Sequence, residues 1–143
     1  MVTWPSRGLR GKPFEDLINH TLEIYRKNNL CLIQKILTPI TPIEFNKERG
    51  QISLAYFEKK STVDYIGVVQ SVPVCFDAKE CHTDRFSLQN IHSHQIDFMK
   101  DFELQGGTAF FLIYFTHKNI FYYLRLREAV KFIKRSLIGF GLR

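Results

Sequence analysis

Cysteine is scarce in this sequence, and its spacing fits neither a metal site nor a disulfide framework. The three residues Cys31, Cys75 and Cys81 are odd in number, and no CxxC or Cys/His spacing typical of zinc connects them. We therefore expect free thiols in a reducing cytoplasm. With 143 residues the chain has the length of one compact domain that buries its own core, so it needs no disulfide for stability.

Long apolar runs are also missing. The longest strongly apolar run, from Ala109 to Phe115, is far short of the ~20 residues of a membrane-spanning helix. The first fifteen residues have no apolar stretch of the kind found in signal peptides. We expect a soluble, cytoplasmic protein without a membrane partner. Internal repeats, low-complexity tracts and long linkers are absent too, which predicts a single domain over residues 1–143.

Acidic residues are in deficit. The sequence has 20 Lys and Arg against 14 Asp and Glu, giving a formal net charge of +6. This excess favours a polyanionic partner or an anionic membrane surface. A hydrophobic content of 45% with 14% aromatic residues excludes the disordered and fibrous classes.

The apolar periodicity predicts a mixed α/β fold with one central sheet and flanking helices. Apolar residues at helical spacing predict a first amphipathic helix over residues 13–28. Two further helices are predicted over 88–105, where Gly106 and Gly107 would end the helix, and over 127–137. Strands are predicted over 30–37, 109–116 and 121–126, and a projecting hairpin with a charged tip is predicted from 43–45 and 51–57.

The segment STVDYIGVVQSVPVCFDAKE, residues 61–80, reads as a buried hairpin that carries charged residues. If it turns symmetrically about Gln70 and Ser71, Asp64 lies opposite Asp77. Thr62 would then lie opposite Lys79, and all four polar side chains would project from one face. Gln-Ser lacks the Gly or Asn that a two-residue turn prefers. A four-residue loop over 69–72 would keep the same register.

Two opposed carboxylates are unfavourable in a dry sheet unless one is protonated or a cation lies between them. Mg²⁺, which prefers oxygen ligands, would meet this requirement at Asp64 and Asp77. Lys79 could then position the nucleophile and stabilise charge developing on a phosphate oxygen. The alternative is a diagonal ion pair between Asp64 and Lys79 at the sheet edge.

Two further polar residues could reach the same pocket. Gln95 lies within the apolar stripe of the second predicted helix, so its amide must find a metal, a metal-bound water or a backbone group. Glu15 shares a side of the first helix with Ile18, although capping or solvent exposure would explain it equally well. Cys75 has no neighbouring His base, so packing accounts for it better than nucleophilic catalysis.

An ordered set of motifs resembles the RecU Holliday-junction resolvases, which are homodimeric members of the restriction-endonuclease-like superfamily. The resemblance extends from about Ser6 to Ile138. The motifs that carry it are Ser6-Arg7-Gly8, Phe14-Glu15, Thr38-Pro39, Ala55-Tyr56-Phe57, STVDYIG at 61–67, FDAKE at 76–80, Phe86-Ser87-Leu88-Gln89-Asn90 and His94-Gln95.

The resemblance implies a restriction-endonuclease-like mixed sheet with a short projecting stalk hairpin at about 43–57. It implies that Thr62, Asp64, Asp77 and Gln95 bind Mg²⁺, for which Mn²⁺ can substitute, and that Lys79 stabilises the transition state. Asp77 stands where many relatives carry Glu. The implied activity is symmetric hydrolysis of phosphodiesters in four-way DNA junctions during recombination and repair, with recombinase or branch-migration proteins as further partners.

We expect DNA contacts to be mainly with phosphates, and a homodimer to match the two-fold symmetry of a junction. The alternatives are a non-catalytic junction- or recombinase-binding module and a nuclease of the same fold acting on flaps or linear DNA. The candidate DNA-binding residues are Arg7, Arg10, Lys12, Lys47, Arg49, Lys59, Lys60, Lys131, Lys134 and Arg135.

Overall fold

A five-stranded mixed sheet forms the body of the protein. The structure is a computed structural model that describes residues 12–57 and 62–141, with side chains for 13–55 and 62–137. The strand order is β1-β4-β5-β6-β7, with β5 antiparallel to β4 and parallel to β6. The strands are β1 (Cys31–Lys35), β4 (Tyr65–Val69), β5 (Val72–Cys81), β6 (Thr108–Phe115) and β7 (Ile120–Arg125).

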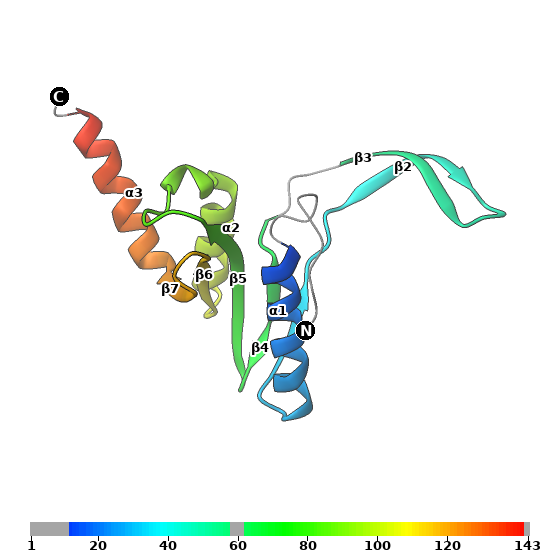
Figure 1. Cartoon of the computed structure of the whole chain (residues 1–143), viewed down its shortest axis with the longest axis horizontal. Helices are drawn as coiled ribbons and strands as arrows, with labels where there is room; N and C mark the ends of the chain where they lie inside the picture. The colour runs from blue at the N-terminus through cyan, green and yellow to red at the C-terminus, as the bar shows by residue number, and fades with distance from the viewer. Residues whose placement is uncertain (1–11, 58–61, 142–143) are drawn as a thin grey trace.

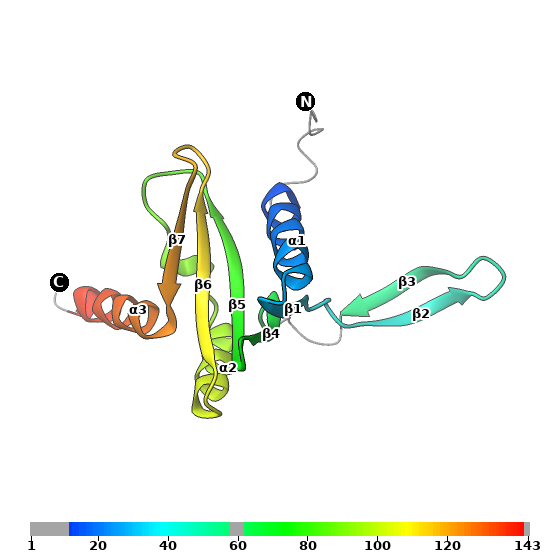
Figure 2. The same ribbon diagram turned by 90° about the horizontal axis from the view of Figure 1, so that it is seen from below.

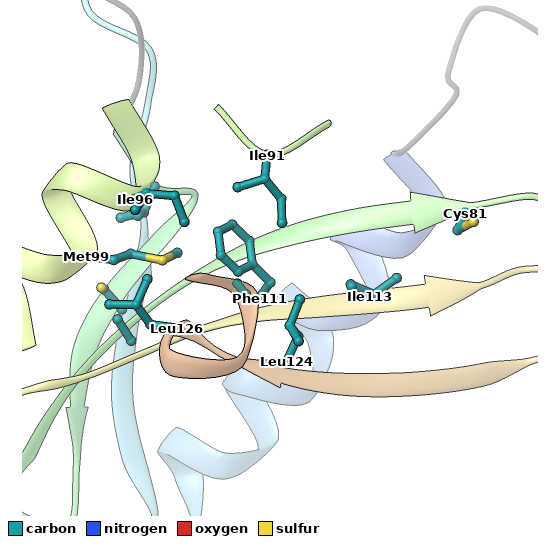
Figure 3. Packing of buried hydrophobic residues seen from close by; sticks show 12 residues of the cluster. Cys81, Ile91, Ile96, Met99, Phe111, Ile113, Leu124 and Leu126 are labelled. Carbon is teal, nitrogen blue, oxygen red and sulfur yellow. The ribbon is translucent and has the colours of Figure 1, made fainter. Parts of the chain in front are cut away.

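Helices cover the two faces of this sheet and create two separate cores. Helix α1 (Lys12–Lys27) lies on one face, while α2 (Ser93–Leu104) and α3 (Leu126–Gly141) lie on the other (Figure 1). Because side chains alternate along β5, Phe76 packs in the α1-side core and Cys75 in the α2-side core. In the α2-side core, the ring of Phe111 points toward α2 and lies beside Met99 (Figure 3). The predicted mixed α/β sheet with flanking helices is confirmed.

The central hairpin has the predicted register but a tighter turn than its sequence favours. Tyr65 pairs with Phe76 and Val69 with Val72, so the strands are symmetric about Gln70 and Ser71. Both turn residues have positive φ, 47° and 71°, as in the two-residue turns that normally require Gly or Asn. The Gln70 side chain donates hydrogen bonds to the carbonyls of Asn29 (2.9 Å) and Leu30 (3.3 Å). These tertiary contacts stabilise a turn that local propensity disfavours.

The stalk hairpin, formed by β2 (Ile40–Asn46) and β3 (Gln51–Phe57), extends away from the body (Figure 2). Its first strand begins three residues before the predicted start, so that it includes Pro42. The strand register shifts between Pro42 and Glu44, which fits the preference of proline for irregular or edge positions. At the tip, the backbone N–H of Arg49 donates to the Asn46 side chain over 3.1 Å.

The helix boundaries differ from prediction at two places. The helix predicted over 88–105 is divided into a 3-10 turn, η1 (Leu88–Asn90), and α2. It ends as predicted: Gly106 has φ 91°, and the N–H groups of Gly106 and Gly107 bond to the carbonyls of Glu103 and Phe102. Helix α3 continues beyond 137 and points away from the sheet, opposite the stalk hairpin (Figures 1 and 2).

Within 12–57 and 62–141, no helix is both long and apolar enough to cross a bilayer.

Candidate active site

The central hairpin brings Asp64 and Asp77 together at the point where β4 begins. Asp64 lies one residue before β4, and its carbonyl accepts a hydrogen bond from the N–H of Ile36 over 2.7 Å. Its carboxylate Oδ2 accepts a second hydrogen bond from the backbone N–H of Ala78 over 2.8 Å. Since Ala78 follows Asp77 on β5, this bond holds the Asp64 carboxyl group against the neighbouring strand.

The two carboxyl groups are close enough to change the protonation of Asp64. Its pKa is raised to about 6, first by burial and then by the negative charge of Asp77. The hydrogen bond from Ala78 and the positive charge of Lys79 oppose this rise without cancelling it. Below about pH 6 the pocket therefore favours a proton on Asp64, and above it the two carboxylates favour a cation beside them.

Asp77 and Lys79 form an ion pair that is shielded from solvent. They are two residues apart on β5 and share the α2-facing side of the sheet with Cys75 and Cys81. Lys79 Nζ lies 2.7 Å from Asp77 Oδ2, and the side chains are 17% and 2% exposed, respectively. This pair fixes the ammonium group beside the two carboxylates, in place of the diagonal pair with Asp64 that the sequence left open.

Gln95 is buried on α2, on the face that the sequence predicted to point inward. Its Oε1 accepts a hydrogen bond from the backbone N–H of His92 over 3.3 Å, while the His92 side chain accepts one from the backbone N–H of Gln95. This reciprocal arrangement caps the start of α2. A carbonyl oxygen has a second lone pair, so Gln95 keeps one acceptor position. Its role as a metal ligand stays a prediction.

Thr62 and Glu15 are placed differently from the central pair. Thr62 is half-buried in the segment before β4, and the β4–β5 pairing starts at Tyr65, so the predicted direct pairing of Thr62 with Lys79 was wrong. The chain bends at Asp64, before the strand begins.

Glu15 forms an ion pair with Lys35, a residue that sequence reasoning did not single out. Lys35 pairs with Tyr65 across β1 and β4, next to Asp64 in the sequence.

The oxygen donors present fit a hard divalent cation. Asp64 and Asp77 supply two carboxylates, and Mg²⁺ is usually held by one or two carboxylates together with waters. Among the residues with described positions, no three or more His, Cys, Asp or Glu side chains gather as a metal-binding group. This donor set does not resemble a zinc centre.

Cys75 is unsuited to nucleophilic chemistry, because burial raises the pKa of its thiol to about 12.

The described candidate DNA-binding residues lie on two protruding elements. Lys47 and Arg49 are exposed at the tip of the stalk hairpin, and Lys131, Lys134 and Arg135 are exposed on α3. Lys12 begins α1, but its side chain lies outside the described set. The remaining candidates outside the described residues are Arg7, Arg10, Lys59 and Lys60.

A polar network that the sequence did not reveal joins the segment after β5 to the turn between β6 and β7. The carboxylate Oδ1 of Asp84 lies 2.8 Å from both His117 Nε2 and Lys118 Nζ, so it joins the segment after β5 to the β6–β7 turn. Lys118, followed by His117, lowers the pKa of Asp84 to about 2. These residues are more than thirty positions apart in the sequence, so no local pattern could have related them.

Comparison with known proteins identifies one family over nearly the whole chain. The family model described as RecU, Recombination protein U, matches residues 9–139. Proteins named Holliday junction resolvase RecU are similar to this chain: the protein of Pediococcus pentosaceus is 36% identical over 132 residues, covering 90% of this chain and 66% of its own length. The Lactococcus lactis protein is 40% identical over 121 residues, covering 82% and 57%, respectively.

A relative from Bacillus cytotoxicus is 34% identical over 136 residues, which cover 92% of this chain and 68% of that protein. The chain thus spans less than two thirds of the Pediococcus and Lactococcus proteins and slightly more of the Bacillus protein. Because the family model covers nearly the whole sequence and identity exceeds 30%, the chain belongs to the RecU family.

Proposed function

We propose that this protein is a Mg²⁺-dependent endonuclease that resolves four-way DNA junctions by symmetric hydrolysis of phosphodiesters. The observation that carries the proposal is the cluster of Asp64, Asp77 and Lys79: two adjacent carboxylates, one with a raised pKa, beside a shielded ammonium group. Membership of the RecU family supports the same activity, because the named relatives are Holliday junction resolvases. We propose that residues 1–143 form one nuclease domain.

The residues of the cluster have distinct roles in this proposal. Asp64 and Asp77 hold the ion, with Thr62 and Gln95 completing the site. When bound, Mg²⁺ supplies a Lewis acid that activates water and neutralises charge on the scissile phosphate; Mn²⁺ can substitute for it. The ammonium of Lys79, fixed by Asp77, positions the nucleophile and stabilises negative charge on the phosphate oxygens.

DNA recognition is proposed to depend on shape and phosphate charge. The cations at the stalk tip and on α3 lie at opposite ends of the molecule (Figures 1 and 2). Phosphate contacts position DNA without reading its sequence, and they weaken as salt increases. A four-way junction, with arms that diverge from one centre, could contact both regions. We propose a cytoplasmic homodimer, with recombinase or branch-migration proteins as further partners.

The substrate proposal is tested by comparing cleavage of four-way junctions, flaps and linear duplexes of matched sequence at one Mg²⁺ concentration. We expect junctions to be cut at least about tenfold faster, because only they present two related strands at a branch point. Equal cleavage of flaps or duplexes would instead identify a nuclease of different specificity. Tight junction binding with neither cleavage nor Mg²⁺ binding would identify a binding module.

Metal affinity is expected to increase with pH between about 5 and 7. Since the pKa of Asp64 in the folded protein is about 6, a proton must leave before this carboxylate can bind an ion. One displaced proton gives an affinity increase of about tenfold per pH unit below the pKa. Titration calorimetry with Mn²⁺ or Mg²⁺ would measure this slope.

The raised pKa of Asp64 also makes the stability of the metal-free protein depend on pH. The folded protein holds the Asp64 proton more tightly than the unfolded chain, whose carboxyl titrates near 3.8. Without divalent cations, this group therefore makes the folded state less stable as the pH rises from about 4 to 6. Asp64→Asn should remove both pH effects. An Mg²⁺ affinity independent of pH in the wild-type protein would contradict the proposed role of Asp64.

A further inference from the structure

Two features at the start of α2 act together on Gln95. The first is the reciprocal cap. The His92 ring accepts a hydrogen bond from the backbone N–H of Gln95, and the Gln95 side chain accepts one from the backbone N–H of His92 over 3.3 Å. Both the main chain and the side chain of Gln95 are therefore tied to one residue. These bonds restrict the rotamers that the Gln95 amide can adopt.

The second feature is a pair of apolar anchors on either side of the cap. Ile91 comes directly before the cap and Ile96 directly after Gln95, and each is 8% exposed and packs in the α2-side core. Both side chains point into this core, where the ring of Phe111 also lies (Figure 3). Apolar residues at these two positions form a hydrophobic staple, which fixes the direction in which the chain enters a helix. The cap therefore cannot shift without moving buried side chains.

The His92 ring is held in place although it is exposed. It is stacked on the ring of His94, with centroids 5.6 Å apart and an angle of 10° between the planes. A side chain that only covered the surface would keep its rotamer freedom, because ordering it has an entropic cost. The stacking instead orders the ring whose nitrogen caps α2.

Helix stability alone does not explain a histidine at this position. Residues that cap the start of a helix are preferentially Asn, Asp, Ser or Thr, whose short side chains reach the N–H of the third helical residue. His92 makes this bond with a larger ring. Its partner Gln95 and the proposed metal ligand Asp77 are the two buried polar residues among those whose side chains the structure describes. Departures from a local preference are expected at functional sites.

We propose that His92 is a positioning residue for the metal site, because its cap of α2 holds the Gln95 amide ready to bind the ion. This inference rests on the proposed function, in which Gln95 completes the site formed by the two aspartates. It adds a residue that does not touch the ion and acts through Gln95. Groups that orient metal ligands in this way commonly raise metal affinity by about 10–100-fold.

The affinity of the metal-free protein for Mn²⁺ tests this role, measured by titration calorimetry at one pH above the pKa of Asp64. His92→Ala removes the ring acceptor and should weaken Mn²⁺ binding by about tenfold. His92→Asn should bind within about threefold of the wild type, because its side-chain oxygen can accept the hydrogen bond from the N–H of Gln95. The matched control is His20→Ala, which removes an exposed histidine from α1 and should leave the affinity unchanged.

A double-mutant cycle separates positioning from a general effect on the helix. Gln95→Ala keeps the backbone N–H at position 95, so His92→Ala removes the same cap in the wild type and in Gln95→Ala. The free energy of unfolding, measured with urea, should therefore fall equally in the two backgrounds. Mn²⁺ affinity should respond differently: after Gln95→Ala has weakened it by about tenfold, His92→Ala should change it by less than about twofold, because no ligand is left to position. Independent losses that multiply would overturn the inference.

Hydrogen exchange of the backbone amide at position 95 reports the cap without any metal. We expect this amide to exchange about tenfold faster in His92→Ala than in the wild type, and His92→Asn to restore its protection. Unchanged exchange in His92→Ala would show that the ring does not hold the start of α2. A His92→Asn variant that restores protection but binds Mn²⁺ as weakly as His92→Ala would also overturn the inference.

The Mn²⁺ titrations distinguish failure of this inference from failure of the proposed function. Normal Mn²⁺ binding by His92→Ala or by Gln95→Ala, beside a loss of binding in Asp64→Asn, would overturn the positioning role and leave the carboxylate site intact. A wild-type protein that binds neither Mn²⁺ nor Mg²⁺ would refute the metal site itself, and the positioning role with it.

Discussion

Asp64→Asn, Asp77→Asn and Lys79→Ala are each expected to reduce junction cleavage by at least about 10²–10³-fold, the range observed when a single charge-stabilising group is removed from an active site. The two asparagine variants remove the carboxylates that we propose as metal ligands, and Lys79→Ala removes the ammonium group that is paired with Asp77 and that we propose stabilises the phosphate. Junction binding should stay within about threefold of the wild type, because binding depends on phosphate contacts elsewhere. Single-turnover cleavage and a filter-binding assay would measure both quantities.

The control for this series is Asp101→Asn. Asp101 is an exposed acid on α2, so its substitution changes the net charge equally without altering the candidate site. It should cleave at the wild-type rate. Retained cleavage in both Asp64→Asn and Lys79→Ala would remove the active-site assignment.

Gly67→Ala is expected to reduce the free energy of unfolding by about 3 kcal/mol or more, toward the upper end of the effects of overpacking. A Cβ at Gly67 would lie 2.0 Å from the carbonyl oxygen of Leu32 and 2.5 Å from the Cα of Ile33. Both obstructing atoms belong to the backbone of β1, so no side-chain rotation can relieve the clash. The β1–β4 pairing must open, which should lower Tm by about 10 °C.

Gly50→Ala is the matched control for this prediction. Gly50 has φ 61° and no atom within 4 Å of the position of a Cβ, so the substitution introduces backbone strain without a clash. Its cost should be only about 1 kcal/mol. Equal destabilisation by the two variants, measured by urea unfolding, would show that close approach of β1 is not what requires glycine at 67.

Several local features could be predicted because they depend on neighbouring residues. A symmetric turn about Gln70 and Ser71 gave the register that brings Asp64 toward Asp77, and the two glycines after α2 specified the end of that helix. The inward position of Gln95 followed from the spacing of its apolar neighbours. In each case, helix or strand geometry alone relates the residues concerned.

Other features depend on contacts between distant segments. The turn at Gln70 and Ser71 adopts positive φ at residues that do not favour it, because Gln70 bonds to the loop after α1. Lys79 pairs with Asp77, and Glu15 with Lys35, although the sequence allowed other partners for both. A charged side chain has many possible partners, and only the packing of strands and helices decides which of them is near.

By itself, the sequence determined the mixed α/β organisation, the facing acidic residues of the central hairpin and the basic character of the chain, since periodicity and composition act over short distances. Only the tertiary structure decided that α1 leaves part of its apolar stripe exposed, that Gly67 lies against the backbone of β1, and that Asp77 is paired with the shielded ammonium group of Lys79. These features arise where elements far apart in the sequence come into contact. The free energies of such contacts depend on distances between atoms, and the spacing of residues along the sequence does not give those distances.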